Sequence, residues 1–209
     1  MTRMAAIVAV GSLAGAKSRL GESLDAEERE DLVERLLERT VLAALAVGPL
    51  EDVLVVSPDR EVLRRATDLG ARSLRQRSEG LNAGLAEARA DVVAGGATAV
   101  LILPIDLPFV TTPAIAAVVA PLSGPDPESG SMVVLVPDRH GSGTNALALR
   151  PPDVIDFAFG PGSRQAHRAA AEASGAAYVE IAGPLTVDLD TPDDLVFVES
   201  IAPEGIGAG

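Results

Sequence analysis

Acidic side chains that could hold a divalent cation occur in two segments of the sequence. Asp106 lies between two prolines in LPIDLP, directly after the most apolar run of the chain, residues 98–103. Proline fixes its backbone angles and ends a strand, so we expect Asp106 to be held rigidly. In VDLDTPDDL, Asp188 and Asp190 lie on one face of an extended segment and would repel each other unless a cation lay nearby. These carboxylates suit Mg²⁺. The alternatives are a turn-capping Asp106 and a purely structural Asp190.

A loop of small residues follows the first apolar run. Residues 11–19, GSLAGAKSR, include Lys17, the only lysine, whereas the other 16 of the 17 basic residues are arginines. In an open parallel sheet, ligands gather at the carboxyl ends of the strands, and small residues let backbone N–H groups approach phosphate oxygens. Lys17 and Arg19 would then neutralise a triphosphate. The alternative is a flexible surface loop with two solvated charges.

The same loop comes close to the P-loop pattern GxxxxGK[ST]. Gly11, Lys17 and Ser18 match it, but Ala16 stands where the second glycine is needed. A helix should also begin directly after the lysine, whereas residues 23–25 place the helix start several residues later. We therefore expect a wider loop. A P-loop hydrolase or kinase remains one alternative function, and a nucleotide-binding module without catalysis remains another.

Two further loops combine glycine with hydroxyl groups. They are GSGTN at 141–145 and FGPGS at 159–163, the second of which leads into an expected helix. Ser163 and the start of that helix offer donors and a partial positive charge to an anion, although Ser163 could serve only as an N-cap. The only histidines, His140 and His167, lie close to these loops, where a structural role is more common than metal binding or acid–base chemistry.

The elements that must position these residues alternate along the chain. Apolar runs predict strands at residues 5–10, 52–56, 98–103, 132–136, 146–149 and 177–181, and helical spacing predicts helices at 25–46, 59–69, 81–93, 113–119, 163–174 and from residue 192. Asp25, Thr112 and Thr191 are the expected caps. The turn-rich residues 121–131 are too poor in apolar side chains to pack. Strands alternating with helices predict a parallel sheet covered on both faces.

Composition limits the class of protein. With 209 residues, 47% of them apolar, the chain is expected to form a single domain over residues 1–202, followed by a flexible tail at 203–209. It has no cysteine, which excludes disulfides and thiolate chemistry. Its net charge of -13 argues against nucleic-acid binding. No apolar run reaches the roughly 18 residues of a membrane span, so we expect a cytoplasmic protein without membrane partners.

Taken in order, these segments resemble a family of guanylyltransferases that make the deazaflavin redox coenzyme, factor 420, from phosphoenolpyruvate or 2-phospho-L-lactate. The resemblance extends over about residues 5–195. It rests on AKSRL at 16–20, LPIDLP at 103–108, DRHGSGTNAL at 138–147, FGPGS followed by His167, and VDLDTPDDL at 187–195. It implies an α/β fold of the nucleotide-diphospho-sugar transferase type, Rossmann-like, with three layers and a mostly parallel sheet.

The resemblance also implies a reaction, in which GMP passes from GTP to the phosphate of a three-carbon acid and pyrophosphate is released. Phosphoenolpyruvate is the expected acceptor, giving enolpyruvoyl-2-diphospho-5'-guanosine, and 2-phospho-L-lactate and 3-phosphoglycerate are alternatives. Carried over by position, the implied acceptor residues are Thr144, Gly160 and Ser163, the Mg²⁺ ligands are Asp106 and Asp188, the catalytic residues are Lys17, Arg19 and Asp106, and the nucleotide-binding residues are Gly11, Ser12, Lys17 and Asn82.

One position departs from the family pattern, because Gly11 stands where lysine is usual. The resemblance therefore does not fix how tightly the triphosphate is held. A phosphate monoester with a second pKa of ~6 is a dianion at neutral pH, so the acceptor needs no general base. Charge neutralisation at the α-phosphate and the leaving pyrophosphate is what the reaction requires. A homodimer, and hand-over of a labile product to the next enzyme of the pathway, are the expected partner relations.

Overall fold

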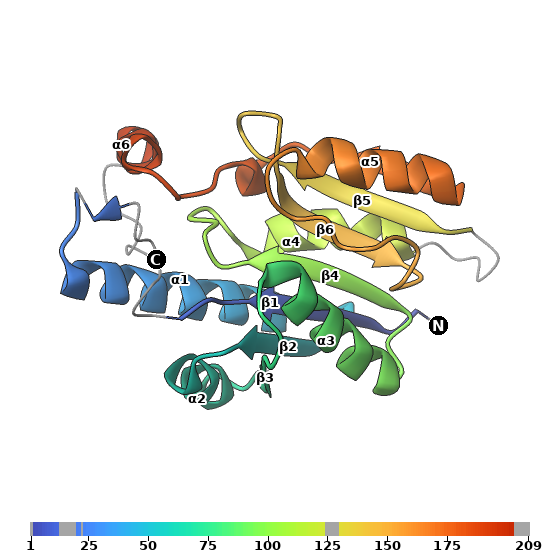
Figure 1. The fold of residues 1–209 in the computed structure, drawn as a ribbon, viewed down its shortest axis with the longest axis horizontal. Helices are drawn as coiled ribbons and strands as arrows, with labels where there is room; N and C mark the ends of the chain where they lie inside the picture. The colour runs from blue at the N-terminus through green and yellow to red at the C-terminus, as the bar shows by residue number, and fades with distance from the viewer. Residues whose placement is uncertain (1, 13–19, 22, 124–129, 203–209) are drawn as a thin grey trace.

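The computed structural model describes residues 2–12, 20–21, 23–123 and 130–202, and the expected tail at 203–209 lies outside them. The elements, in chain order in Figure 1, are β1 (Met4–Ala9), α1 (Ala26–Leu45), β2 (Leu50–Ser57), α2 (Arg60–Asp68), β3 (Arg72–Arg75), α3 (Leu81–Ala94), β4 (Ala99–Pro104), α4 (Thr112–Val119), η3 (Ala120–Ser123), β5 (Met132–Pro137), β6 (Thr144–Arg150), α5 (Ser163–Ser174), β7 (Ala177–Glu180), η4 (Pro184–Thr186) and α6 (Pro192–Ile201).

The strands form a seven-stranded sheet in the order β3-β2-β1-β4-β6-β5-β7. Alternate residues of a strand point to opposite faces. In β1, Ala6 and Val8 pack into one buried cluster with side chains of α1 and α4. Ala5 and Ile7 pack into a second cluster with side chains of α3 and α5. Helices therefore cover both faces, and the expected three-layer α/β fold is confirmed.

The sheet is mostly parallel, as expected, and β6 is the exception. β1 runs parallel to β2 and β4, whereas β6 pairs antiparallel with both β4 and β5. Only residues 138–143 join β5 to β6, and so short a connection forms a hairpin, because a parallel crossover needs a dozen residues or more. Since β6 runs backwards, its first residues lie at the same edge of the sheet as the carboxyl end of β4.

Several local expectations need correction. β6 begins at Thr144 rather than at residue 146, so Thr144 and Asn145 are strand residues; Thr144 pairs with Pro137 of β5, and Asn145 lies at an irregularity in the register. The turn-rich segment does pack at its start, because Leu122 in η3 is fully buried and its carbonyl accepts a hydrogen bond from Arg150. Strand β3 was not expected; it is an edge strand with β2 as its partner, and its sequence, RSLR, has no apolar run.

The helix caps follow local sequence closely. Asp25 forms the expected capping box with Glu28 at the start of α1. At α4 the cap is Thr111, not Thr112: the Thr111 side chain accepts from the Ala114 backbone, while the Thr112 hydroxyl donates to the Ala43 carbonyl. None of the helices in the described ranges has the length and apolar character needed to cross a lipid bilayer.

Candidate active site

The two segments that carry the predicted metal-binding carboxylates are hydrogen-bonded to each other at the carboxyl edge of the sheet. Asp106 follows β4, and its carbonyl accepts a hydrogen bond of 2.9 Å from the Leu189 backbone, which joins the two acidic segments. Burial raises the pKa of Asp188 above its ordinary value, and the charges of Asp106 and Asp190 raise it further. These like charges therefore interact, as a cation-binding arrangement requires.

Asn145 holds Asp188 in place. Its amide nitrogen donates to the Leu185 carbonyl at 3.1 Å and to Oδ1 of Asp188 at 3.4 Å. Asn145 is buried, and it stands at the start of β6, beside β4. Sequence reasoning missed this role because the two residues are far apart in the chain. Asn145 could be noted in the sequence as part of GSGTN, but its position along the chain does not indicate a contact with Asp188.

An ion pair between the buried Asp194 and the partly exposed Arg139 fixes the segment that carries Asp188 and Asp190. Arg139, just after β5, donates to Oδ1 of Asp194 at 2.5 and 3.0 Å. Oδ2 of Asp194 accepts from the Asp190 backbone, and from the backbone and hydroxyl of Thr191, in the capping box of α6. Burial acts to raise the pKa of Asp194, but these hydrogen bonds outweigh it and hold the pKa below its ordinary value. Figure 1 shows α6 beyond the strand ends.

Asp194→Ala should lower the free energy of unfolding by about 2–4 kcal/mol, because it removes a helix cap and the charge-assisted hydrogen bonds that the Asp194 carboxylate accepts from Arg139. Urea unfolding at neutral pH measures the loss. The exposed Asp193 in the same helical turn provides the control, since Asp193→Ala should change stability by less than about 0.5 kcal/mol. Equal losses in the two variants would show that the ion pair contributes nothing specific.

The end of β2 holds the start of the predicted nucleotide loop. The buried Ser57 hydroxyl accepts from the Asp59 backbone at 3.0 Å and donates to the Gly11 carbonyl at 3.4 Å. The Ser12 hydroxyl donates to Asp59 at 3.2 Å. Gly11 and Ser12 themselves are exposed. The rest of the loop, including Lys17 and Arg19, lies outside the described residues.

Gly11 is not required by the backbone. Among the described residues, no atom lies within 4 Å of where its Cβ would stand, and its φ is not in the left-handed region. The Cβ of a lysine, the usual family residue, would therefore meet none of the described neighbours at this position.

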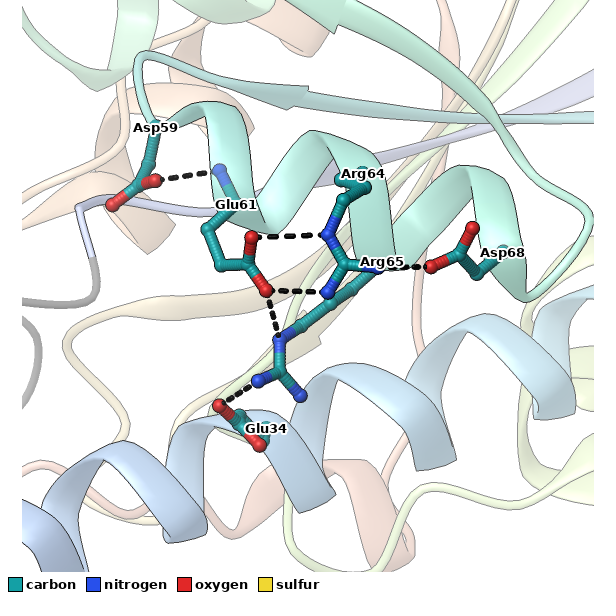
Figure 2. Close-up of polar contacts among 6 residues, drawn as sticks. All are labelled: Glu34, Asp59, Glu61, Arg64, Arg65 and Asp68. Atoms are coloured by element: carbon teal, nitrogen blue, oxygen red, sulfur yellow. Dashed lines mark hydrogen bonds and ion pairs between the residues drawn. The ribbon is translucent and has the colours of Figure 1, made fainter.

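Charged side chains join α2 to α1 beside this loop. Figure 2 shows Arg65 of α2 between Glu34 of α1 and Glu61, with Arg64 bonded to Glu61 and Asp68. The hydrogen bond from Arg64 is the main cause that lowers the pKa of Glu61 to about 2. A cavity of about 480 Å³ lies between these helices, and its lining is mainly acidic and arginine side chains of α1 and α2. Since such exposed pairs contribute ~0–1 kcal/mol each, we assign this cluster to surface structure rather than to the site.

The two glycine-hydroxyl loops are bonded to each other. Arg164, in the first turn of α5, donates through its backbone to the Ser142 carbonyl at 3.2 Å and through its guanidinium to the Gly141 carbonyl at 2.9 Å. Asp138 closes the first loop by accepting from the Ser142 backbone at 2.7 Å. Thr144 follows this loop, so the segments predicted to hold the acceptor are neighbours in the structure.

The second loop depends on glycine. Gly160 has a φ of +130° and Gly162 a φ of +75°, conformations that L side chains rarely adopt. The N-cap of α5 is Gly162, so Ser163 is not the cap but the first residue of the helix. The Ser163 backbone N–H donates to the Gly160 carbonyl at 3.1 Å, and the residue is buried.

Asn82 has a different environment from the one expected of a nucleotide ligand. Its amide nitrogen donates to the Phe159 carbonyl at 3.0 Å, and its oxygen accepts from the Phe159 backbone at 2.9 Å. It therefore ties the start of α3 to the second loop. Of the other predicted site residues in the described part of the chain, the structure brings Thr144, Gly160 and Ser163 together, and Asp106 with Asp188.

Comparisons with known proteins agree with this architecture. A solved structure from Desulfovibrio desulfuricans, described as a nucleotide-diphospho-sugar transferase, superposes with a TM-score of 0.77 over 97% of this chain and 88% of that one, at 15% identity. The fold is thus the nucleotide-diphospho-sugar transferase type, as expected. The family model "Guanylyl transferase CofC like" matches residues 4–201. The chain belongs to this family.

Two curated relatives carry the name phosphoenolpyruvate guanylyltransferase. The one from Sphaerobacter thermophilus is 44% identical over 201 residues, which is 96% of this chain and 94% of the relative. The one from Rubrobacter xylanophilus is 45% identical over 196 residues, 93% of each. The expected class, a nucleotidyltransferase, is confirmed. The P-loop alternative finds no support, since α1 begins at Ala26 rather than directly after Lys17.

Proposed function

We propose that this protein transfers GMP from GTP to the phosphate of phosphoenolpyruvate in deazaflavin coenzyme biosynthesis, forming enolpyruvoyl-2-diphospho-5'-guanosine and pyrophosphate. One observation carries the proposal. In a chain of the guanylyl transferase family, Asn145 bonds Asp188 and directly follows Thr144 in β6, while the Leu189 backbone bonds the Asp106 carbonyl. This arrangement can bring a nucleotide and a phosphorylated acid to a single edge of the sheet.

The chemistry needs positioning more than proton transfer. A phosphate oxygen of the acceptor attacks the α-phosphorus of GTP, so that one P–O bond forms and the bond between the α-phosphorus and the bridging oxygen of the pyrophosphate breaks. The acceptor phosphate, with a second pKa of ~6, is already a dianion at neutral pH. The protein must therefore hold the two anions in line and offset their repulsion.

The residues present fit Mg²⁺. Asp106 and Asp188 supply carboxylate oxygens, and in the described ranges no group of three or more metal-ligating side chains gathers. Mg²⁺ in proteins is bound through one or two carboxylates, with water and substrate phosphates completing its shell. Bound to this pair, Mg²⁺ would supply positive charge to the α-phosphate and the leaving pyrophosphate. In the proposal, Lys17 and Arg19 add positive charge from the nucleotide loop. Gly11 and Ser12, at the start of the same loop, contact the nucleotide.

Thr144, Gly160 and Ser163 are proposed to hold the acceptor. The backbone N–H groups of Ser163 and Arg164 already donate to the Gly160 and Ser142 carbonyls, so what the first turn of α5 offers the acid is the Ser163 hydroxyl and the partial positive charge of the helix start. The Asn82 amide, bonded to Phe159, supports the same loop. Its proposed part in nucleotide binding is then indirect.

Ser163→Ala should raise the KM for phosphoenolpyruvate by about ten-fold, the loss expected for one hydrogen bond to a charged group, and leave the KM for GTP within about two-fold. Steady-state kinetics with each substrate varied in turn measures the split. Ser174→Ala, at the other end of α5, is the matched control and should change neither constant. Equal changes in both KM values would place Ser163 in the scaffold.

The assay that tests the function supplies GTP, Mg²⁺ and, in turn, phosphoenolpyruvate, 2-phospho-L-lactate and 3-phosphoglycerate, and follows pyrophosphate and inorganic phosphate separately. Pyrophosphate release that depends on phosphoenolpyruvate supports the proposal. Inorganic phosphate release without any acid would indicate a hydrolase instead. The proposal includes hand-over of the product, so adding the next enzyme of the pathway should accelerate pyrophosphate release. It also includes a homodimer, and analytical ultracentrifugation measures the mass of the assembly in solution.

A further inference from the structure

His167 lies in the middle of α5, and its side chain is fully buried. Both of its ring nitrogens are hydrogen-bonded. The Ala158 backbone N–H donates to Nε2 at 3.0 Å, so Nε2 carries no hydrogen. Burial lowers the pKa of His167 to about 4, which leaves the ring neutral at neutral pH. A neutral imidazole carries one hydrogen, and here it must be on Nδ1.

That tautomer fixes the direction of a second hydrogen bond. Nδ1 lies 3.0 Å from the Thr144 hydroxyl oxygen, so Nδ1 donates and the hydroxyl accepts. The hydrogen of the Thr144 hydroxyl then has to point away from His167. In the part of the chain that the structure describes, no other hydrogen-bond partner of this hydroxyl is found. Thr144 is 9% exposed and stands at the edge where the acidic pair lies.

The same ring also fixes the other acceptor loop. Through Ala158 it holds the backbone just before Phe159, whose ring contacts the imidazole edge-on with centroids 5.1 Å apart. Asn82 holds the Phe159 backbone through two further hydrogen bonds. One imidazole therefore connects the start of β6 to the loop that leads into Gly160. Sequence reasoning noted His167 but had no means of pairing it with Thr144.

We propose that His167 is a positioning residue of the acceptor site: it turns the Thr144 hydroxyl hydrogen toward the anionic group of the bound acid and holds the 158–160 backbone in register with it. The inference rests on the proposed function. A hydroxyl already oriented for donation binds an anion more tightly than a freely rotating one, because less freedom is lost on binding. Nothing in this role requires His167 to touch the substrate.

Two substitutions separate the two hydrogen bonds. In His167→Asn, the shorter amide stands near the position of Nδ1 and can still donate to Thr144. In His167→Gln, the carboxamide oxygen can reach the position of Nε2 and accept from Ala158, but Thr144 loses its donor. We expect His167→Gln to raise the KM for phosphoenolpyruvate about ten-fold, with the KM for GTP unchanged. His167→Asn should retain an acceptor KM within about three-fold of wild type.

A double-mutant cycle tests whether His167 acts through the hydroxyl. Thr144→Val keeps the shape and removes the hydroxyl, and we expect it to raise the acceptor KM on its own. Adding His167→Gln to Thr144→Val should then change the acceptor KM by less than about two-fold, because the partner of Nδ1 is already gone. Val92→Ala is the control for lost packing, since Val92 of α3 belongs to the buried cluster against which Phe159 packs. It should lower the melting temperature without splitting the two KM values.

The tautomer can be measured without turnover. Nitrogen-15 NMR of the imidazoles is simple here, because His140 is the only other histidine. We expect His167 to show a protonated Nδ1 and an unprotonated Nε2 at neutral pH, and the reverse would overturn the inference.

The kinetic results distinguish a failure of the role of His167 from a failure of the proposed function. An unchanged acceptor KM in active His167→Gln, additive effects in the cycle, or parallel changes in both KM values would overturn the role of His167 and leave the proposed function standing. Wild-type protein that transfers GMP to none of the three acids would overturn the proposed function, and the inference with it.

Discussion

Asp106→Asn is expected to abolish GMP transfer and leave the fold intact. The amide keeps the size of the carboxylate but cannot offer negative charge to a cation. Removing residues that only orient metal ligands costs about 10- to 100-fold, so losing a direct ligand should reduce kcat by at least ~10²-fold. The fold should survive, because neutralising Asp106 removes a charge that repels Asp188. Initial rates of pyrophosphate release at saturating Mg²⁺ measure the effect.

A surface aspartate provides the control for Asp106. Asp156 pairs with Arg89, and its side chain is 96% exposed. Asp156→Asn makes the same chemical change away from the acidic pair and should leave kcat within about two-fold of wild type. Undiminished turnover in Asp106→Asn would remove Asp106 from the mechanism, and the metal site with it.

Asp188→Asn should separate activity from stability. We expect kcat to fall by at least ~10²-fold, as for the other proposed ligand. In the presence of a chelator, however, the variant should melt at a higher temperature than wild type at neutral pH. The reason is that burial and the charge of Asp106 disfavour the ionised Asp188 carboxylate, and the variant carries no such charge.

The pH dependence of that difference follows from the direction of the pKa shift. The pKa of Asp188 is higher in the folded protein than the unfolded value of about 4. The folded state therefore binds the proton more tightly, and the destabilisation is present above the folded pKa and disappears as the pH falls through it. Melting curves of the two proteins with chelator should converge as the pH is lowered. Mg²⁺ should then raise the melting temperature of wild type more than that of Asp188→Asn.

A variant that is less stable than wild type at neutral pH in chelator would contradict this account of Asp188. It would mean that the carboxylate is held by favourable contacts stronger than the repulsion from Asp106. Asn145, which donates to Asp188, would be the first residue to examine in that case.

The helix starts were predictable because their determinants are local. Asp25 with Glu28, and Thr191 with Asp194, lie three residues apart, so each capping box can be read from a few letters of sequence. The one error, Thr112 for Thr111, arose because two adjacent threonines can both cap, and the contact with the Ala43 carbonyl that takes the second hydroxyl comes from another helix.

Strand assignment worked where the strand is buried and failed where it is not. β4 lies inside the sheet and is almost entirely apolar, so its sequence alone marks it. β3 lies at the edge and has exposed arginines at both ends, and only its pairing with β2 makes it a strand. The early start of β6 also depends on a partner, since Thr144 pairs with Pro137 of β5.

The acidic segments of the site could be located from sequence, but the residues that hold them could not. Asp106 and Asp188 were predictable from carboxylates at the ends of extended segments. Arg139 lies 55 residues from Asp194, and Asn145 lies 43 residues from Asp188. Contacts between residues so far apart in the chain form only when the sheet folds, and the spacing of residues along the sequence does not predict them.

Isotope transfer from the acceptor tests the central claim most directly. Phosphoenolpyruvate carrying ¹⁸O in its phosphate group, incubated with GTP and Mg²⁺, should give a guanylylated product that retains all of the label and a pyrophosphate that contains none. That distribution requires an oxygen of the acid's phosphate to attack the α-phosphorus. Label-free guanosine nucleotides, accompanied by inorganic phosphate from the terminal position of GTP, would contradict the account.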